Sequence, residues 1–470
     1  MVKWLNGLKR KDKNTIDRIW WIGIFLVSIL FYLIWYWMDG IILTEDAQSY
    51  ISMTSDREPG YCIFLAVLRS VFDSGALHAA VIIQCIVAAW AAAAVAMGLK
   101  KRFSLNCAGM LLILFIQYGV TLLNRFVAQR RYSYYNSIET EGLCYSLWIF
   151  FFLCILGIVY DHSKKSAAAA VLWSVILISI RKQMLITLII LVLCLFYVGW
   201  KEKDWKRAVT SIVLCAAGVL VATTLIDCSY NLAVRGVFTS HSGDSSFILG
   251  TELYLADLDM EKDLQTEERR ELFQEIMRRT DEQEYNIIYA REGKPEGIRG
   301  SFLWNWQAIE NHYSLSYDRI KFDVVMAVIR EYQEKTGVPE DERQDHYNEI
   351  AGSMMKELFI PCIPGLMKLF ACNVIHGMIT TILKVHRLLN WAAVIIYGVY
   401  AALFIDLRRR GIRDSLPFAA VVILAIVVNV CFTSLTIYPQ MRYMLYNTAL
   451  FYQAGAVMCI QGWTQKRVKG

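Results

Sequence analysis

Long apolar runs constrain this chain more than any other feature of its sequence. A helix needs about 20 predominantly apolar residues to cross the ~30 Å hydrocarbon core of a bilayer. The chain has 470 residues, is 56% hydrophobic and has a mean hydropathy of +0.39. An ordinary soluble domain has no need of that composition, so the sequence predicts an integral membrane protein. The candidate spans are 19–38, 77–98, 106–124, 142–160, 166–200, 207–227, 388–407, 416–436 and 444–463.

One of these runs, 166–200, is too long for a single crossing and carries polar residues in its middle. The segment from Ser179 to Gln183 (SIRKQ) interrupts the run. Because charged residues are costly inside a bilayer, we expect two short helices that meet at one face of the membrane. The predicted fold is an all-α polytopic membrane protein with about ten transmembrane helices.

Basic residues in the short loops predict the orientation of the spans. With ten spans, every basic cluster falls on the same side, and the positive-inside rule makes that side cytoplasmic. Both termini are then cytoplasmic, and the loop 39–76 is external. The net charge of +6 follows from this topology and requires no nucleic-acid partner. The clusters are Lys9–Lys13, Lys100–Arg102, Lys164–Lys165, Lys201–Arg207, Arg408–Arg413 and Lys466–Lys469.

The spans divide the chain into three segments. A seven-span module (1–227) and a three-span module (388–470) flank an external segment (228–387). Apolar residues recur at helical spacing within 272–277 and 320–332, which predicts amphipathic helices in the external segment.

The external segment also contains turn signals and a change of character near its end. Turns are expected at Gly293–Gly297 and at Gly337–Pro339. Over 359–387, two prolines and a sparsely charged apolar run predict a segment that lies at the membrane interface.

Twelve cysteines are scattered along the chain, and most lie inside predicted spans. They form no Cys-x-x-Cys motif and no Cys/His pattern at metal-ligand spacing, so neither a zinc site nor a disulfide framework is indicated. Cys362 and Cys372 in the external segment could pair with each other, or they could be unpaired apolar cysteines.

The loop after the first span carries acids close to the membrane, among them Asp46, Asp56 and Glu58. Acids beside hydrocarbon are costly unless they face water or a ligand, so they indicate a site. Asp46 is the strongest candidate, with Tyr50 one helical turn beyond it. Its carboxylate could take a proton from an acceptor hydroxyl. The alternative, of equal weight, is that Asp46 caps a short helix over 47–54.

A Pro-Gly turn follows Glu58 directly and shapes this part of the loop. Glu58 with Asp46 or Asp56 could hold a divalent cation, Mg²⁺ or Mn²⁺, because hard cations prefer oxygen ligands. The alternative is that Arg57 neutralises a neighbouring acid.

Basic residues on the predicted external side form a second group. The positive-inside rule disfavours basic residues on this side, so their presence indicates that they have anionic partners. A lipid phosphate or pyrophosphate is the favoured partner, since arginine suits bidentate phosphate contacts. The alternative is pairing with protein acids such as Glu139 and Glu141. Glu141 also begins a span, where the helix dipole favours an acid. The basic residues are Arg125, Arg130, Arg131, Arg181, Lys182 and Arg442.

The pattern Asp46-Ala-Gln-Ser-Tyr50, followed by Arg57-Glu-Pro-Gly-Tyr61, resembles the first external loop of the GT-C superfamily glycosyltransferases. These polytopic enzymes use polyprenyl-phosphate sugars, and they include protein O-mannosyltransferases and aminoarabinose transferases. The chain departs from the family at Cys62, where a proline is usual. Three further stretches agree with the family in kind and order: Ser137 to Leu143, Ile178 to Leu185 and Ile437 to Leu450.

The resemblance implies roles for individual residues. Asp46 corresponds to the catalytic or acceptor-orienting carboxylate, and Glu58 takes the place of a glutamate that contributes to metal binding in some relatives. The donor phosphate would be faced by Arg181, Arg442 and Tyr443. The full set of candidate substrate-binding residues is Tyr50, Arg57, Tyr61, Arg125, Arg131, Glu141, Arg181, Lys182, Arg442 and Tyr443.

The expected function is that of a GT-C-type glycosyltransferase with an extracytoplasmic active site in a plasma membrane, with a bacterial source favoured. It would move a sugar from a polyprenyl-phosphate carrier to an acceptor glycan, lipid or protein, by direct displacement with inversion. One alternative is an envelope polysaccharide polymerase or ligase that uses a diphosphate-linked donor. The other is a lipid or glycan transporter without chemistry, which would leave the acids of the first loop unexplained.

Overall fold

Helices make up nearly all of the part of the chain that the computed structural model describes, and two short strands form one bridge. The described residues are 2–126, 132–241, 245–292, 302–340, 342–383 and 390–469. The predicted all-α class is therefore confirmed. The chain forms two compact units: unit 1 contains 1–241, 381–428 and 444–470, and unit 2 contains 242–380 and 429–443.

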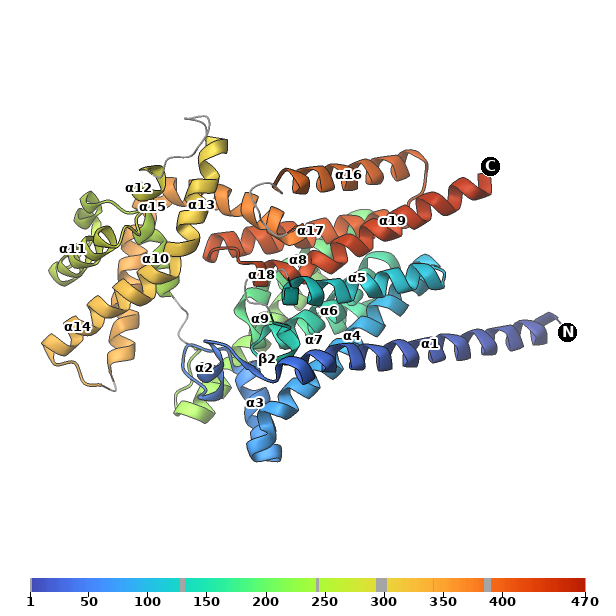
Figure 1. The fold of residues 1–470 in the computed structure, drawn as a ribbon, viewed down its shortest axis with the longest axis horizontal. Coiled ribbons are helices and arrows are strands. Elements are labelled where there is room, and N and C mark those ends of the chain that lie inside the picture. Colours follow the sequence, from blue (N-terminus) through green and yellow to red (C-terminus); the bar gives the residue numbers. More distant parts are fainter. Residues whose placement is uncertain are drawn as a thin grey trace. The chain divides into compact units, whose positions relative to one another are not determined.

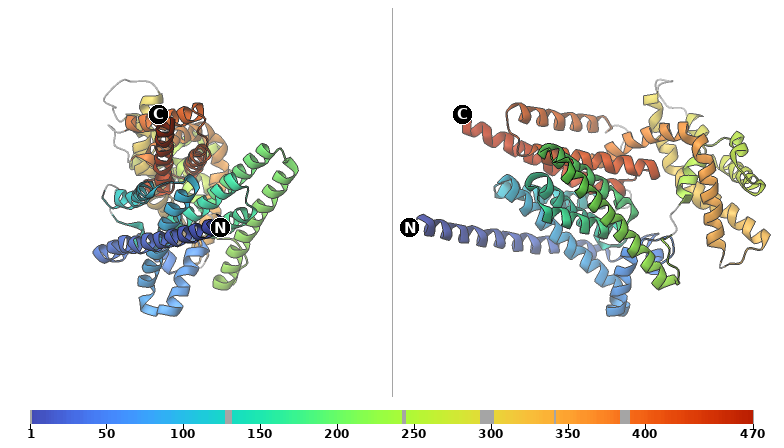
Figure 2. Two further views of the ribbon diagram at one scale, coloured as in Figure 1. Left: turned by 90° about the vertical axis from the view of Figure 1, so that its right-hand side faces the viewer. Right: turned by 180° about the vertical axis from the view of Figure 1, so that it is seen from behind.

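Unit 1 contains most of the long apolar helices (Figures 1 and 2). Helix α17 begins in unit 1 and ends in unit 2. The elements of unit 1 are α1 (Val2–Asp39), β1 (Ile42–Leu43), α2 (Ala47–Ile51), α3 (Pro59–Phe72), α4 (Ala76–Phe103), α5 (Cys107–Phe126), β2 (Ser137–Ile138), α6 (Glu141–Asp161), α7 (Lys164–Ile180), α8 (Ile186–Glu202), α9 (Trp205–Arg235), α16 (Asn390–Arg409), α17 (Leu416–Thr436) and α19 (Thr448–Lys469).

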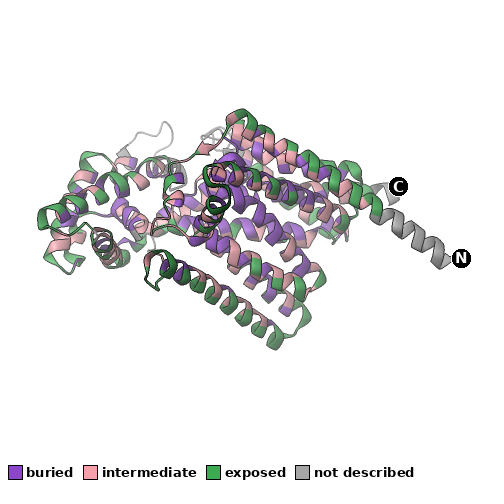
Figure 3. Ribbon diagram, turned by 90° about the horizontal axis from the view of Figure 1, so that it is seen from below, coloured by how far each residue is buried: buried purple, intermediate pink, exposed green. Residues whose placement is uncertain are grey.

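The alanine-rich helix α4 packs against α1, α3, α5 and α6. Ala88, Ala89, Ala92, Ala93 and Ala96 are each at most 1% exposed. Small side chains let helix axes approach closely, which is a common basis of helix packing in membranes. Figure 3 shows buried residues gathered where the helices of unit 1 face one another, with exposed residues on the outer faces.

Helix α9 lies at the outer edge of unit 1, where Figure 2 shows it in green. It packs against α7 and α8. Its other face exposes large apolar side chains, such as Val213, Leu214 and Val221. An apolar surface of this kind is suited to contact with lipid.

Eight helical segments among the described residues are long and apolar enough to cross a membrane, so the chain is a multi-pass membrane protein. The break expected within 166–200 is confirmed. Helix α7 ends at Ile180, Arg181 has extended backbone angles (φ −156°, ψ 122°), and a short 3₁₀ turn over Lys182–Leu185 leads into α8.

The described part of the 359–387 segment is helical, and its place at the membrane interface stays a prediction. This part belongs to α15 (Arg343–Ile382), which has 40 residues and is one of the eight candidate spans. Pro361 and Pro364 lie inside this helix. Each proline removes a backbone hydrogen bond and usually kinks or ends a helix, yet α15 continues past both, and its apolar side chains pack within unit 2. Leu358 and Leu369 are at most 2% exposed there.

The basic clusters that flank several spans meet at one end of unit 1, which we call the basic end. Side chains join the helix ends here. Arg102 donates to Asp161 at 2.7 Å, and Tyr160 donates to the carbonyl of Asp414 at 2.6 Å. The ends of α4 and α6 and the turn between α16 and α17 therefore lie together. Arg207 at the start of α9 is also 3.7 Å from Glu202 at the end of α8.

The opposite end of unit 1, the loop end, is organised by the bridge between β1 and β2. The strands are parallel and pair Ile42 with Ser137 and Leu43 with Ile138. The side chain of Asn136 donates to the carbonyl of Gly40 at 3.0 Å. The first loop after α1 is thereby tied to the residues that precede α6, although these lie far apart in the sequence.

Unit 2 is built from shorter helices, and it confirms the predicted amphipathic pattern. Leu272, Phe273 and Ile276 are buried on α11, and Ile320 and Val324 are buried in a π-helical segment between α13 and α14. The helices are α10 (Ser245–Leu255), α11 (Glu267–Glu282), α12 (Ile287–Glu292), α13 (Phe302–Arg319), α14 (Met326–Thr336), most of α15, and α18 (Met441–Met444), which reaches the unit boundary.

The predicted turns and the possible cysteine pair of this region have different outcomes. The turn at Gly337 is confirmed, since Gly337 ends α14 with a φ of +75°; the turn at 293–297 lies outside the described residues. Cys362 and Cys372 are both buried free cysteines on α15, so they do not pair. Cys362 instead donates to the carbonyl of Glu252 at 3.6 Å.

Candidate functional site

Charged side chains gather at the loop end of unit 1 around Tyr50. We call Asp46, Tyr50, Arg57, Glu141 and Arg181 the loop cluster. Two ion pairs form it, one between Asp46 and Arg57 and the other between Glu141 and Arg181. Arg57, Glu141 and Arg181 each act electrostatically on the Tyr50 hydroxyl, and Asp46 contacts Arg57 directly. Three separate parts of the chain contribute: the loop after α1, the start of α6 and the break between α7 and α8.

Asp46 forms the first ion pair with Arg57, whose Nη2 lies 2.7 Å from Asp46 Oδ1. Asp46 stands at the N-cap position of α2, but its side chain makes no capping hydrogen bond. The carboxylate is therefore held by Arg57, and not by the helix it precedes. The Asp46 side chain remains 32% exposed, so one side of it is open to solvent or a ligand.

Tyr50 is 5% exposed, and the Arg57 guanidinium lies 4.8 Å from the centre of its ring. Burial raises the pKa of the Tyr50 phenol, and Glu58 raises it further. Burial alone would lower the pKa of Arg57, but Tyr50, Asp46 and Asp56 raise it overall. Tyr50 therefore stays neutral and Arg57 stays charged, so the Asp46 carboxylate faces a guanidinium cation.

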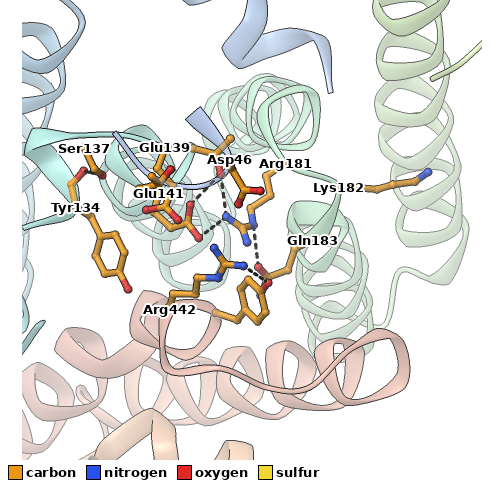
Figure 4. Close-up of polar contacts among 12 residues, drawn as sticks. Asp46, Tyr134, Ser137, Glu139, Glu141, Arg181, Lys182, Gln183 and Arg442 are labelled. Atoms are coloured by element: carbon orange, nitrogen blue, oxygen red, sulfur yellow. Dashed lines mark hydrogen bonds and ion pairs between the residues drawn. The ribbon is translucent and has the colours of Figure 1, made fainter. Parts of the chain in front are cut away.

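Glu141 and Arg181 form the second ion pair, with 2.5 Å between Oε1 and Nη1. The Glu141 side chain is fully buried, and the Arg181 side chain is 14% exposed. Arg181 also donates to Thr140 Oγ1 at 2.8 Å and to Gln183 Oε1 at 3.1 Å. Figure 4 shows the guanidinium between Glu141 and Gln183, while Lys182 points away from it. A protein acid is therefore one partner of Arg181.

Gly60 allows the two parts of the loop cluster to come together. A Cβ at this position would lie 2.7 Å from the backbone carbon and oxygen of Ser179. The start of α3 therefore packs directly on the end of α7. On the same contact, the backbone N–H of Lys182 donates to Glu58 Oε1 at 2.8 Å.

Replacing Gly60 with alanine is expected to lower the free energy of unfolding by about 1–3 kcal/mol, because the backbone of Ser179 has to move. Thermal unfolding of the detergent-solubilised protein would measure the change. Gly119→Ala is the matched control, since nothing lies within 4 Å of a Cβ at Gly119. Equal stability of the two variants would show that Gly60 on α3 does not lie as close to the backbone of Ser179 on α7 as the 2.7 Å distance implies.

A cavity of about 210 Å³ adjoins the loop cluster, and its lining includes Glu58, Lys182, Asp227 and His241. His241 Nδ1 lies 2.6 Å from Asp227 Oδ2. Asp227 is 8% exposed, and its Oδ1 has no hydrogen-bond partner among the described residues. Neither residue is among those predicted from the sequence. The signal for Asp227 was present, because an acid near the end of an apolar span is costly unless it has a function or a partner.

Two of the candidate substrate-binding residues of unit 1, Tyr61 and Arg125, have partners outside this cluster. Tyr61 is fully buried and its hydroxyl donates to Gln84 at 2.9 Å, so it supports the loop and has no exposed atom for a ligand. Arg125 forms a two-pronged ion pair with Asp39, at 2.7 and 2.8 Å. Arg131 lies outside the described residues.

The predicted metal ligands do not form a ligand set. Asp56 lies 3.5 Å from Arg57, whereas Glu58 accepts the backbone N–H of Lys182. No three His, Cys, Asp or Glu side chains lie close enough to hold a metal ion in the described part of the chain. In the described part of the chain, Asp56 therefore faces the Arg57 guanidinium and Glu58 accepts a backbone N–H.

Arg442 and Tyr443 belong to unit 2. Arg442 Nη2 donates to Tyr443 Oη at 2.8 Å, and its guanidinium lies 4.8 Å from the Tyr443 ring centre. Asn429 donates to the carbonyl of Tyr443 at 2.8 Å, which holds the turn after α17.

Comparisons of the chain with protein-family models, with curated proteins and with solved structures each found no match. The GT-C resemblance therefore rests on the residues of the chain itself.

Proposed function

We propose that this protein is a membrane glycosyltransferase of the GT-C type, which moves a sugar from a polyprenyl-phosphate carrier to an extracytoplasmic hydroxyl acceptor. The observation that supports the proposal is the loop cluster. It offers a half-exposed carboxylate, Asp46, in the same small region as the guanidinium of Arg181. A displacement at the anomeric carbon needs both a base and a cation for the leaving phosphate.

In the proposed reaction, the acceptor oxygen attacks the anomeric carbon of the donor sugar. The new carbon–oxygen bond forms as the bond to the carrier phosphate breaks, and the phosphate oxygen keeps the electron pair. Asp46 accepts the proton of the acceptor hydroxyl. A single displacement inverts the anomeric centre.

The two arginines of the loop cluster have different roles in this proposal. Arg57 orients Asp46 through the 2.7 Å contact. Arg181 faces the leaving phosphate with the exposed part of its side chain, since arginine suits phosphate.

The 210 Å³ cavity beside the cluster suits a hydroxyl-rich ligand. Its lining provides carboxylates at Glu58 and Asp227 and hydroxyls at Thr223 and Ser240, with apolar walls between them. Sites for sugars commonly combine such polar groups with an apolar surface. In this proposal the cavity receives part of the acceptor.

Asp46→Asn is expected to lower the rate of transfer by about 100-fold or more, because asparagine cannot accept the proton. The assay would supply a panel of polyprenyl-phosphate sugars and a membrane extract as acceptor, and would measure the released carrier by mass spectrometry. Glu45→Gln is the matched control, since Glu45 is the exposed neighbouring acid.

Full transfer activity of Asp46→Asn would contradict the proposal. Release of a polyprenyl diphosphate would point to the polymerase or ligase. Movement of the lipid across the bilayer without a new glycosidic bond would point to a transporter.

A further inference from the structure

A second cavity, of about 680 Å³, lies at the basic end of unit 1 between α8, α16 and α17. It is separate from the loop cluster, because α8 starts beside the cluster and reaches this cavity only towards its other end. Most of its lining is apolar, including Leu193, Phe404 and Leu424, and three basic side chains also line it.

The three basic residues are Lys201 at the end of α8, Arg408 at the end of α16 and Arg413 in the turn to α17. None of them takes part in an ion pair among the described residues. Arg410 differs, since it pairs with Asp406 at 3.0 Å and donates to the carbonyl of Gly462 at 2.9 Å. The arginine that holds the helices together is thus distinct from the two that line the cavity.

The turn that carries Arg413 is held in place by specific contacts. Gly411 has a φ of +74°, which reverses the chain after α16. Tyr160 on α6 donates to the carbonyl of Asp414 at 2.6 Å and accepts the backbone N–H of Phe418 at 3.1 Å. The turn that places Arg413 at the cavity is therefore fixed by contacts with α6.

The acid nearest in sequence to Lys201 is already engaged. Glu202 contacts His162 Nδ1 and forms an ion pair with Arg207 at 3.7 Å. Positive charges without a counterion around one cavity attract an anion, and basic pockets between membrane helices are suited to lipid headgroups.

The cavity also extends into the apolar part of the unit. Leu193 precedes Lys201 by eight positions on α8, and at 1.5 Å per residue this corresponds to about 12 Å along the helix. A small soluble anion would need only the charged end. A cavity with basic side chains at one end and apolar side chains along the rest of its lining fits an anion that carries a hydrocarbon chain.

We propose that this cavity binds an anionic phospholipid from the leaflet at the basic end of unit 1. Lys201, Arg408 and Arg413 bind the phosphate headgroup, and the Tyr197 hydroxyl, which also lines the cavity, donates to it. One acyl chain lies along the apolar walls of α8 and α17. The assignment is independent of the proposed transferase activity, whose residues lie at the other end of the unit.

The test titrates the full-length, delipidated protein in detergent with palmitoyl-oleoyl phosphatidylglycerol or phosphatidylcholine, and counts bound lipids by native mass spectrometry. Phosphatidylglycerol is expected to bind at least tenfold more tightly. The variant Lys201→Gln/Arg408→Gln/Arg413→Gln is expected to lose about fivefold in affinity for each charge removed, or about a hundredfold in total.

The matched control is Lys101→Gln/Lys206→Gln/Arg409→Gln, which removes three exposed charges that do not line the cavity. It is expected to keep its affinity within about twofold. Equal losses in both variants would mean a diffuse charge effect and would overturn the proposal.

A further variant tests the apolar wall. Ala420 lines the cavity and is exposed, so Ala420→Trp fills the space without disturbing a packed core. Loss of phosphatidylglycerol binding in this variant is the expected result. Competition by glycerol 3-phosphate as strong as by the lipid itself would show a site for a soluble anion and would overturn the lipid assignment.

Discussion

Replacing Arg181 with methionine is expected to lower the free energy of unfolding by about 3–5 kcal/mol, because it leaves Glu141 as a buried charge without its cation. The Glu141 side chain is fully buried, and Arg181 lies 2.5 Å from it. Chemical or thermal unfolding of the purified protein in detergent would measure the loss. Lys182→Met is the matched control, since its side chain is exposed and is expected to change the stability little.

A double variant separates the structural role of Arg181 from a role in binding phosphate. In Arg181→Met/Glu141→Gln both charges are absent, so most of the stability is expected to return. Transfer activity is expected to stay low, because the proposed phosphate-binding cation is still missing. Recovery of both stability and activity would show that Arg181 serves only to neutralise Glu141.

Glu252→Gln is expected to change how the stability of unit 2 depends on pH. Glu252 is fully buried on α10, and neither carboxylate oxygen has a hydrogen-bond partner among the described residues. Burial raises its pKa from the usual 4.5 to about 8. The folded state thus keeps a proton that the unfolded state loses, so the free energy of unfolding falls as pH rises from 4.5 to about 8.

Glutamine resembles the protonated acid, so the variant is expected to match the wild type near pH 5 and to exceed its stability at pH 8 by about 2–4 kcal/mol. Thermal unfolding between pH 5 and pH 8.5, followed by tryptophan fluorescence, would measure this. Glu267→Gln is the control, because its side chain is 77% exposed. Parallel pH profiles of the wild type and Glu252→Gln would refute a raised pKa at this site.

Local patterns in the sequence predicted most of the long helices. Apolar runs identified the long membrane helices, and the polar residues from Ser179 to Gln183 located the break between α7 and α8. Helical spacing of apolar residues identified α11 and α14. Each of these patterns involves residues only a few positions apart, and helix formation depends on hydrogen bonds and side-chain burial at the same short spacing. The continuous α15 is the exception, because prolines usually kink or end a helix and this one continues past Pro361 and Pro364.

The partners of the charged residues, in contrast, could not be predicted from the sequence. The sequence left open whether the external arginines bind phosphate or protein acids, and the structure pairs Arg125 with Asp39 and Arg181 with Glu141. It also could not show that Asp227 and His241 meet Glu58 at one cavity.

The sequence by itself determined that the chain is an all-α membrane protein and which of its segments carry acids and bases near a membrane. The tertiary structure alone decided which of those charges meet. The reason is that charge pairs between distant segments depend on how the helices pack. This packing depends on close contacts between distant residues, such as that of Gly60 with Ser179, which exist only in the folded chain.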